Sequence, residues 1–493
     1  MVPISSMFDR REPGAARPGT GLDALVVAAA LAVAVGTALR FTAGFDQPLW
    51  LDETFTGAIA AQPDLAGLGH QIYADVNAPL YYVVMYGWVR LAGLSDLSLR
   101  LPSAIFSTAA VLFALRGGRG LDRRHCLLWG ALLSLWQPGL AQASDARCYG
   151  LLLPTATVTT IAFARLLAKP DRPGAFLWAC LACATVLTHY FAAPLVAGQG
   201  LMLLLRHRSR ALRLWPALVA FLPALAWMAY HAPRLAEFAR PEIVWYGRLT
   251  LTDLPGIVLY AVPPVALLCL VIAGGLLIYG RLGRRDPTPG NEAAWVTAAS
   301  LAGFAVVLTA AYVRPSFTLR YMIPFVPGLL LGVALVIRAS SAVWPRFPVV
   351  AIVLFGAALV AFVPPRRAYS FEAASEAIAQ AGARRVVFLW DHPSAPIQDP
   401  AQMQAVGGFF LARAGHPVEV VALRTPWTED PQPAFLAAAG SDPATALLWV
   451  YDANLPQTAA LAHPPRIDAN DPAWRCRNHA AAPFVALVCL RQP

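Results

Sequence analysis

The chain has 493 residues, of which 58% are hydrophobic and only 13% are charged, whereas an ordinary soluble domain has about 25% charged residues. Several apolar runs reach the ~20 residues that a helix needs to cross ~30 Å of hydrocarbon. The composition therefore indicates a polytopic membrane protein. The net charge of +10 does not indicate a nucleic-acid binder, because the basic residues lie in the connections between apolar runs, where they act as topology signals.

The two ends of the chain differ from its apolar middle. Residues 1–20 are rich in Arg, Pro and Gly, and we expect them to form a disordered cytoplasmic tail. The apolar run that follows is too long for a signal-peptide core and lacks a convincing small-residue cleavage site, so we expect it to stay as a signal anchor. Cys476 and Cys489 fall in the polar C-terminal region and could form a disulfide if that region is exported.

Apolar runs between these ends predict about eleven membrane-spanning helices. Together they form a transmembrane domain over residues 21–365. The spans are expected at 22–40, 101–115, 126–141, 148–166, 175–188, 191–205, 214–230, 257–279, 294–312, 322–337 and 348–363.

Residues 78–93 decide the topology. Their many aromatic side chains suit the membrane interface as well as its interior. If this segment does not cross, the later basic loops all lie on the same side as the Arg-bearing N-terminus, as the positive-inside rule requires. We therefore expect a juxtamembrane or re-entrant segment within a first extracytoplasmic loop, 41–100. In a bacterial inner membrane the N-terminus is then cytoplasmic and the C-terminal region periplasmic.

The composition changes after Pro364-Pro365. Helices are expected at 371–381 and 402–414, and strands at 385–390, 418–423 and 446–451. Such alternation is typical of a small α/β domain. No Gly-rich nucleotide loop is present, so residues 366–493 are interpreted as an accessory domain.

An acidic pair, Asp52-Glu53, follows the first apolar run by about ten residues. Carboxylates beside a membrane span are costly unless they face water or a polar cavity, so the pair is a candidate functional site. Either residue could take a proton from an acceptor hydroxyl or help to hold a cation. The alternative is a helix N-terminus that carries acids, which is favourable by a few tenths of a kcal/mol.

Further polar residues are predicted at the outer ends of later helices. Asp75, in the stretch Asp75-Val-Asn77-Ala-Pro79, could bind a metal or a sugar, or could cap a helix. Arg147 is suited to bidentate recognition of a phosphate, and Asp145 could orient Arg147, bind a metal or simply pair with it.

Two more candidates lie further along the chain. His189, in Thr188-His189-Tyr190, is interpreted as an interfacial histidine rather than a catalytic one. Arg320 stands where a span re-enters the membrane, so it could neutralise a lipid-linked phosphate. The alternative is that its side chain only extends to the headgroups.

Six motifs in this order resemble a known family, the polyprenyl-phosphate-dependent membrane glycosyltransferases of the C-superfamily. The similarity is to the branch of protein O-mannosyltransferases, lipid A aminoarabinose transferases and lipopolysaccharide-core galacturonosyltransferases, and it covers most of 22–365. The motifs are LDETFT, DVNAPLYY, LRLPSAIFS, ASDARCYG, THYFA and LRYMIPFVPG.

The resemblance implies a cavity at the outer membrane surface in which a sugar moves from a polyprenyl phosphate to the hydroxyl of a lipid, glycan or protein acceptor. It implies that Asp52 is the general base, supported by Glu53, and that direct attack inverts the anomeric centre. By the same resemblance, Asp75 and Asp145 line the cavity, and Arg147, Tyr149, Arg320 and Tyr321 help to bind the phosphate and lipid of the donor. Asn77 and His189 are further candidates for donor or substrate binding.

Two questions stay open on the sequence alone. Some family members bind a divalent cation and others need none, so a cation held by Asp52, Asp75 or Asp145 is an option and not a requirement. This chain also departs from the family pattern, because Asn77 is followed by Ala78-Pro79 and not by two prolines. The competing function is a transporter or a flippase for lipid-linked sugars, although the chain shows no internal repeat of the kind that many transporters have.

Overall fold

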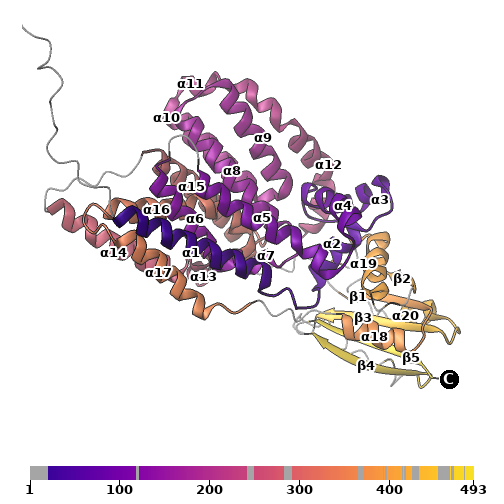
Figure 1. The fold of residues 1–493 in the computed structure, drawn as a ribbon. Coiled ribbons are helices and arrows are strands. Elements are labelled where there is room, and N and C mark those ends of the chain that lie inside the picture. Colours follow the sequence, from indigo (N-terminus) through magenta and orange to yellow (C-terminus); the bar gives the residue numbers. More distant parts are fainter. Residues whose placement is uncertain are drawn as a thin grey trace, which may run out of the picture.

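A computed structural model places helices along the chain as far as residue 361 and a five-stranded sheet after it (Figure 1). The predicted tail, apart from Thr20, lies outside the residues that the structure describes. These are residues 20–117, 121–240, 249–282, 291–364, 371–391, 394, 397–413, 415, 418–424, 432–452, 467, 471–481 and 484–492.

Seven helical stretches in the described residues are long and apolar enough to cross a membrane, and Arg172–Thr188 and Phe347–Ala361 are shorter apolar helices. The polytopic helical architecture is therefore confirmed, while the total of about eleven spans stays a prediction. The seven are Ala24–Thr42, Asp96–Arg116, Tyr149–Ala168, Trp215–Phe238, Pro264–Arg281, Glu292–Val313 and Leu319–Ser340.

Most predicted spans coincide with one helix or with a helix and a short 3-10 segment. The α-helices are α1 (Thr20–Thr42), α5 (Asp96–Arg116), α8 (Tyr149–Ala168), α9 (Arg172–Thr188), α10 (Ala193–His207), α11 (Ser209–Leu212), α12 (Leu222–Phe238), α15 (Asn291–Val313), α16 (Val326–Ser340) and α17 (Phe347–Ala358). The 3-10 segments are η2 (Tyr190–Ala192), η3 (Trp215–Phe221), η4 (Leu319–Phe325) and η5 (Leu359–Ala361).

Two predicted spans are each divided into two helices. The span at 126–141 becomes α6 (Arg123–Ser134) and α7 (Gln137–Ala143), and the span at 257–279 becomes α13 (Leu254–Ala261) and α14 (Pro264–Leu282). Proline explains both breaks, because it starts helices well but disfavours a helical residue before it. Pro138 lies in the first turn of α7, and Val262, just before Pro263, is extended.

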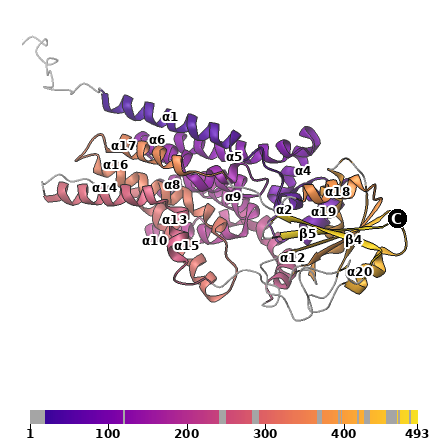
Figure 2. The ribbon, with the colours of Figure 1, turned by 90° about the horizontal axis from the view of Figure 1, so that it is seen from below.

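Three short helices form the first loop and lie between the helical bundle and the C-terminal domain (Figures 1 and 2). They are α2 (Leu51–Ala60), α3 (Leu65–Ala74) and α4 (Leu80–Ala92). The 13 residues of α4 span about 20 Å, less than the hydrocarbon thickness. This length fits the prediction that 78–93 does not cross.

The C-terminal domain is a mixed sheet with strand order β2-β1-β3-β5-β4. β1 is parallel to β2 and β3, while β5 is antiparallel to β3 and β4. The predicted strands and helices are confirmed as β1 (Arg385–Asp391), β2 (Glu419–Leu423), β3 (Thr445–Asp452), α18 (Glu372–Gln380) and α19 (Pro400–Ala412). Sequence reasoning missed α20 (Gln432–Ala439), β4 (Trp474–Ala481) and β5 (Phe484–Arg491).

Both faces of the sheet are covered. Side chains of α18 and α19 pack with Val386 and Phe388 on one face, and α20 packs with Val387 and Leu389 on the other. Alternate residues of β1 therefore enter two hydrophobic cores, which explains the uninterrupted apolar run of that strand.

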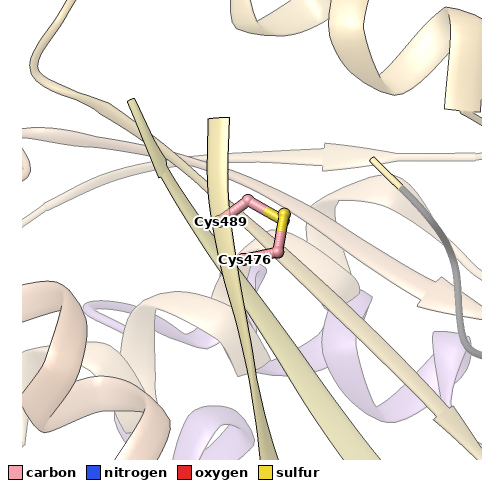
Figure 3. The surroundings of a disulfide bond; sticks show 2 residues. All are labelled: Cys476 and Cys489. Atoms are coloured by element: carbon pink, nitrogen blue, oxygen red, sulfur yellow. A yellow bond between two sulfur atoms is a disulfide. The ribbon is translucent and has the colours of Figure 1, made fainter. Parts of the chain in front are cut away.

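Cys476 of β4 and Cys489 of β5 are directly opposite each other in the antiparallel pair and form a disulfide (Figure 3). The bond joins residues 13 positions apart and fixes β4, an edge strand, to the rest of the sheet.

Replacing both cysteines by serine is expected to lower the free energy of unfolding of the C-terminal domain by about 2–4 kcal/mol, because the bridge limits the freedom of the unfolded chain. Thermal unfolding of the purified full chain measures the loss. Denatured protein extracted from cells should gain two maleimide adducts when it is first reduced; an unchanged adduct count would contradict the bond.

Candidate functional site

Glu53 is fully buried at the start of α2 and pairs with Arg100 of α5. Arg100 Nε donates to Glu53 Oε1 at 2.9 Å, and Arg100 Nη2 donates to Oε2 at 2.7 Å. Glu53 Oε2 also accepts from the backbone N–H of Trp50 at 3.1 Å, which satisfies one backbone donor at the helix start. The carboxylate thus holds α2 against the first long helix that follows the loop.

The same ion pair also forms hydrogen bonds to two other backbone segments, one before α2 and one before α8. Arg100 donates to the carbonyl groups of Phe45, Gln47 and Pro48, and Glu53 Oε1 accepts from the N–H of Ala146 at 2.9 Å. The chain before α2 and the turn that contains Asp145 and Arg147 are therefore positioned by one buried pair. Glu53 thus has a structural role in this arrangement, while the support of Asp52 that the resemblance implies for it stays a prediction.

Asp52 is the neighbour of Glu53, but its side chain is 27% exposed and faces two arginines. Its Oδ2 lies 3.3 Å from Arg320 Nη1 and 3.8 Å from Arg147 Nε. Arg147 Nη1 also donates to the Asp52 carbonyl at 3.0 Å. Three segments therefore meet at the Asp52 carboxylate: the first loop, the turn that precedes α8, and the 3-10 segment η4.

Arg320 lies between two aromatic rings. Its guanidinium carbon is 5.1 Å from the centre of the Trp50 ring and 5.2 Å from that of Tyr149, distances at which a cation and a ring attract each other. Trp50 Nε1 donates to Asp145 Oδ1 at 2.9 Å. Trp50 therefore links Arg320 to Asp145.

Asp75 joins the same group of residues through Tyr82. Asp75 Oδ2 accepts from Asn77 Nδ2 at 3.0 Å and from the Tyr82 hydroxyl, and that hydroxyl accepts from Arg147 Nη1 at 3.4 Å. Burial, and then the nearby Asp75, raise the pKa of Tyr82 well above its ordinary value. The Tyr82 hydroxyl therefore stays protonated and donates a hydrogen bond to Asp75.

His189 lies between α9 and η2 in a group of aromatic rings. Its ring centre is 5.5 Å from that of Tyr149 and 5.0 Å from that of Tyr321, and Tyr321 stacks on Phe191. Burial, together with Arg147 and Arg320, lowers the pKa of His189 to about 3. The neutral imidazole accepts a hydrogen bond from the Phe191 N–H, which fits the predicted interfacial histidine.

The structure thus brings the predicted site residues into one connected network. Sequence reasoning missed three of its members, Arg100, Tyr82 and Trp50. Each lies inside or next to a motif quoted above, but the signal was too weak, because nothing in a sequence shows which arginine of a helix will face a buried glutamate.

The described carboxylates do not fit a divalent cation. In the described ranges no three His, Cys, Asp or Glu side chains are grouped so that they could hold a metal. Asp52 faces two arginines, and Asp75 and Asp145 each accept hydrogen bonds from uncharged side chains.

A cavity of about 130 Å³ lies beside this network and not within it. Its lining comes from the start of α2 and from α5, α18 and α19, and includes Thr54, Asp96, Glu372 and Arg413. None of the predicted site residues lines it, so this cavity is not the expected donor site.

Comparisons with known proteins bear on the fold. A structure of ArnT from Cupriavidus metallidurans bound to undecaprenyl phosphate is similar at a TM-score of 0.56 with 14% identity, over 94% of this chain and 99% of that one. The apo structure of the same protein gives a TM-score of 0.54 with 13% identity, over 96% and 100%. No family model and no curated protein matches the chain.

The chain therefore has the ArnT fold over nearly its whole length. This finding, with the strands of the sheet, confirms the predicted fold class, a polytopic helical membrane domain with a small α/β domain at its C-terminus.

Replacing Glu53 by Gln is expected to destabilise the protein by about 3–5 kcal/mol, because it leaves the Arg100 charge buried without its partner. Thermal unfolding in detergent measures the loss. The matched control is Glu419→Gln at an exposed position of β2; equal melting temperatures for the two variants would contradict the structural role of Glu53.

Proposed function

We propose that this protein is an integral-membrane glycosyltransferase that moves a sugar from a polyprenyl-phosphate donor to an acceptor hydroxyl on a lipid, glycan or protein. The observation that carries the proposal is the placement of one partly exposed carboxylate, Asp52, between Arg147 and Arg320 in a chain with the ArnT fold. The structure of ArnT, which has a similar fold, contains undecaprenyl phosphate, and this supports a polyprenyl-phosphate donor for the present chain.

Arg147 and Arg320 would bind the donor phosphate. Both guanidinium groups present several N–H donors, which suit phosphate oxygens, and the Arg320 side chain is 22% exposed. As the bond to the sugar breaks, negative charge grows on the phosphate, and two fixed cations stabilise that charge.

Asp52 would act as the catalytic base. The acceptor oxygen attacks the anomeric carbon, its proton passes to Asp52, and the bond from that carbon to the phosphate oxygen breaks, so that the polyprenyl phosphate leaves with the bonding electrons. A single direct displacement inverts the anomeric centre. Asp75, Asn77 and Asp145 would orient the sugar or the acceptor, while Tyr149, His189 and Tyr321 would contact the donor beside Arg320.

The proposed location is the bacterial inner membrane, with the N-terminus in the cytoplasm and the C-terminal domain in the periplasm. The disulfide between Cys476 and Cys489 supports this orientation, because such bonds persist in the oxidising periplasm and are rare in the cytoplasm.

The direct test uses membranes from cells that carry the wild type or Asp52→Asn, supplied with undecaprenyl-phosphate donors that bear labelled mannose, aminoarabinose or galacturonic acid. The wild type should transfer label from one of them, and Asp52→Asn should lower the rate by about 10²–10⁴-fold, the usual contribution of a general base.

Asp253→Asn is the matched control, because Asp253 is exposed and bonds only locally to Thr250 among the contacts of the described residues. Equal transfer by the wild type and Asp52→Asn would remove Asp52 as the base. No transfer by the wild type from any donor would favour a transporter or a flippase.

Replacing Arg320 by Lys should raise the KM for the donor about tenfold, because an ammonium group keeps the charge but loses the forked hydrogen bonds to phosphate. Initial rates at varied donor concentration measure this change. Arg314→Lys, at an exposed position six residues before Arg320, serves as the control. The same donor KM in both variants would contradict phosphate binding by Arg320.

A further inference from the structure

Helix α2, which carries Asp52 and Glu53, belongs to two hydrophobic cores at once. Ile59 and Ala60 pack in the core of the membrane domain. Leu51 and Ala58 are buried in the core of the C-terminal domain, together with side chains of α18 and α19. The residue directly before Asp52 is therefore held by the C-terminal domain.

The contact between α2 and α19 is close. Gly57 of α2 faces the ring of Phe409, and a Cβ atom at Gly57 would lie 2.2 Å from Phe409 Cζ. Only glycine allows this approach without a shift of the ring or of one helix. The distance between the two helices is thus set by side-chain size at this point.

Helix α3, which leads into Asp75, is also bonded to α19. Gln71 Nε2 donates to the Ala401 carbonyl and Gln402 Nε2 donates to the Gln71 carbonyl, each at 3.4 Å. His70 Nε2 lies 3.1 Å from Asp399 Oδ1. Asp399 in turn caps α19 by accepting from the Gln402 N–H.

Arg234 of α12 links the membrane domain to α3 and to the C-terminal domain by hydrogen bonds. Its Nε and Nη2 donate to the carbonyl of Ala74, the residue before Asp75, at 3.1 and 3.0 Å. Its Nη1 donates to the Ile397 carbonyl of the C-terminal domain and to Glu237, both at 2.7 Å. Only 8% of Arg234 is exposed, so its donors are committed to these partners.

We infer that the C-terminal domain is a positioning element of the transferase site. It holds Asp52 in position through the contact of Gly57 with Phe409, and it holds Asp75 in position through Arg234. The inference rests on the proposed function and assigns these three residues a role in it. None of them touches the reacting atoms; each acts through the helix or the carbonyl that it holds. Small displacements of a catalytic group are costly in rate, because a base must lie within hydrogen-bond reach of its proton.

A double-mutant cycle on Gly57 and Phe409 tests the inference in the full-length protein. Gly57→Leu should push α2 away from α19 and lower kcat about tenfold, because Asp52 moves with the helix that carries it. Phe409→Ala makes room for the leucine, so the double variant should recover to within about threefold of Phe409→Ala alone, a coupling of the size seen for residues in contact.

Gly69→Leu is the matched control, since it places the same side chain on α3, where no atom lies within 4 Å of the added Cβ. It should leave kcat unchanged. Unchanged kcat in Gly57→Leu, or a loss that Phe409→Ala does not restore, would overturn the inference while leaving the proposed function standing. If the wild type itself transfers no sugar, the proposed function fails, and the inference fails with it.

Arg234→Lys gives a second, independent test through the other contact. A lysine keeps the charge but cannot donate to the Ala74 and Ile397 carbonyls in the same forked geometry. We expect kcat to fall about tenfold, together with a lower melting temperature because charged hydrogen bonds are lost. Wild-type kcat in this variant would remove Arg234 from the positioning role.

Discussion

The first loop depends on the buried ion pair between Glu53 and Arg100. Neither side chain is exposed, and removing two charges from water costs several kcal/mol for each ion unless their hydrogen bonds are satisfied. Here they are satisfied by each other, by three carbonyl groups before α2 and by the N–H groups of Trp50 and Ala146. The pair therefore fixes the loop in one arrangement.

The position of Asp52 follows from that arrangement. Neighbouring residues of a helix point about 100° apart, so when Glu53 faces Arg100 in the interior, Asp52 must face elsewhere. It faces Arg147, from the turn that Glu53 also holds, and Arg320 from η4. Two adjacent acids with the same chemistry thus take different roles because of their surroundings.

Much of the fold could be predicted from the sequence, because apolar runs and basic loops report directly on membrane spans. Proline breaks such as the one before Pro263-Pro264 were harder to foresee, since they interrupt a run that stays apolar. In the C-terminal domain, β4 has the mixed sequence WRCRNHAA, and an edge strand with little buried surface leaves no clear alternation to detect.

The site was predictable as a set of residues but not as a network. Asp52, Asp75, Asp145, Arg147 and Arg320 were recognised from motifs, and the structure connects them. Their supports, such as Arg234 and Phe409, lie far away in the chain and carry no local signal, because their role depends on which distant backbone groups they meet.

The membership of α2 in two cores has a consequence for how the protein is made. Leu51 and Ala58 leave the ribosome more than 300 residues before α19, which completes the core around them. Until α19 has been synthesised, one face of α2 lacks the packing partners that α19 supplies. Asp52 is thus among the first site residues translated, yet one side of its helix gains a packing partner only when the C-terminal domain has been made.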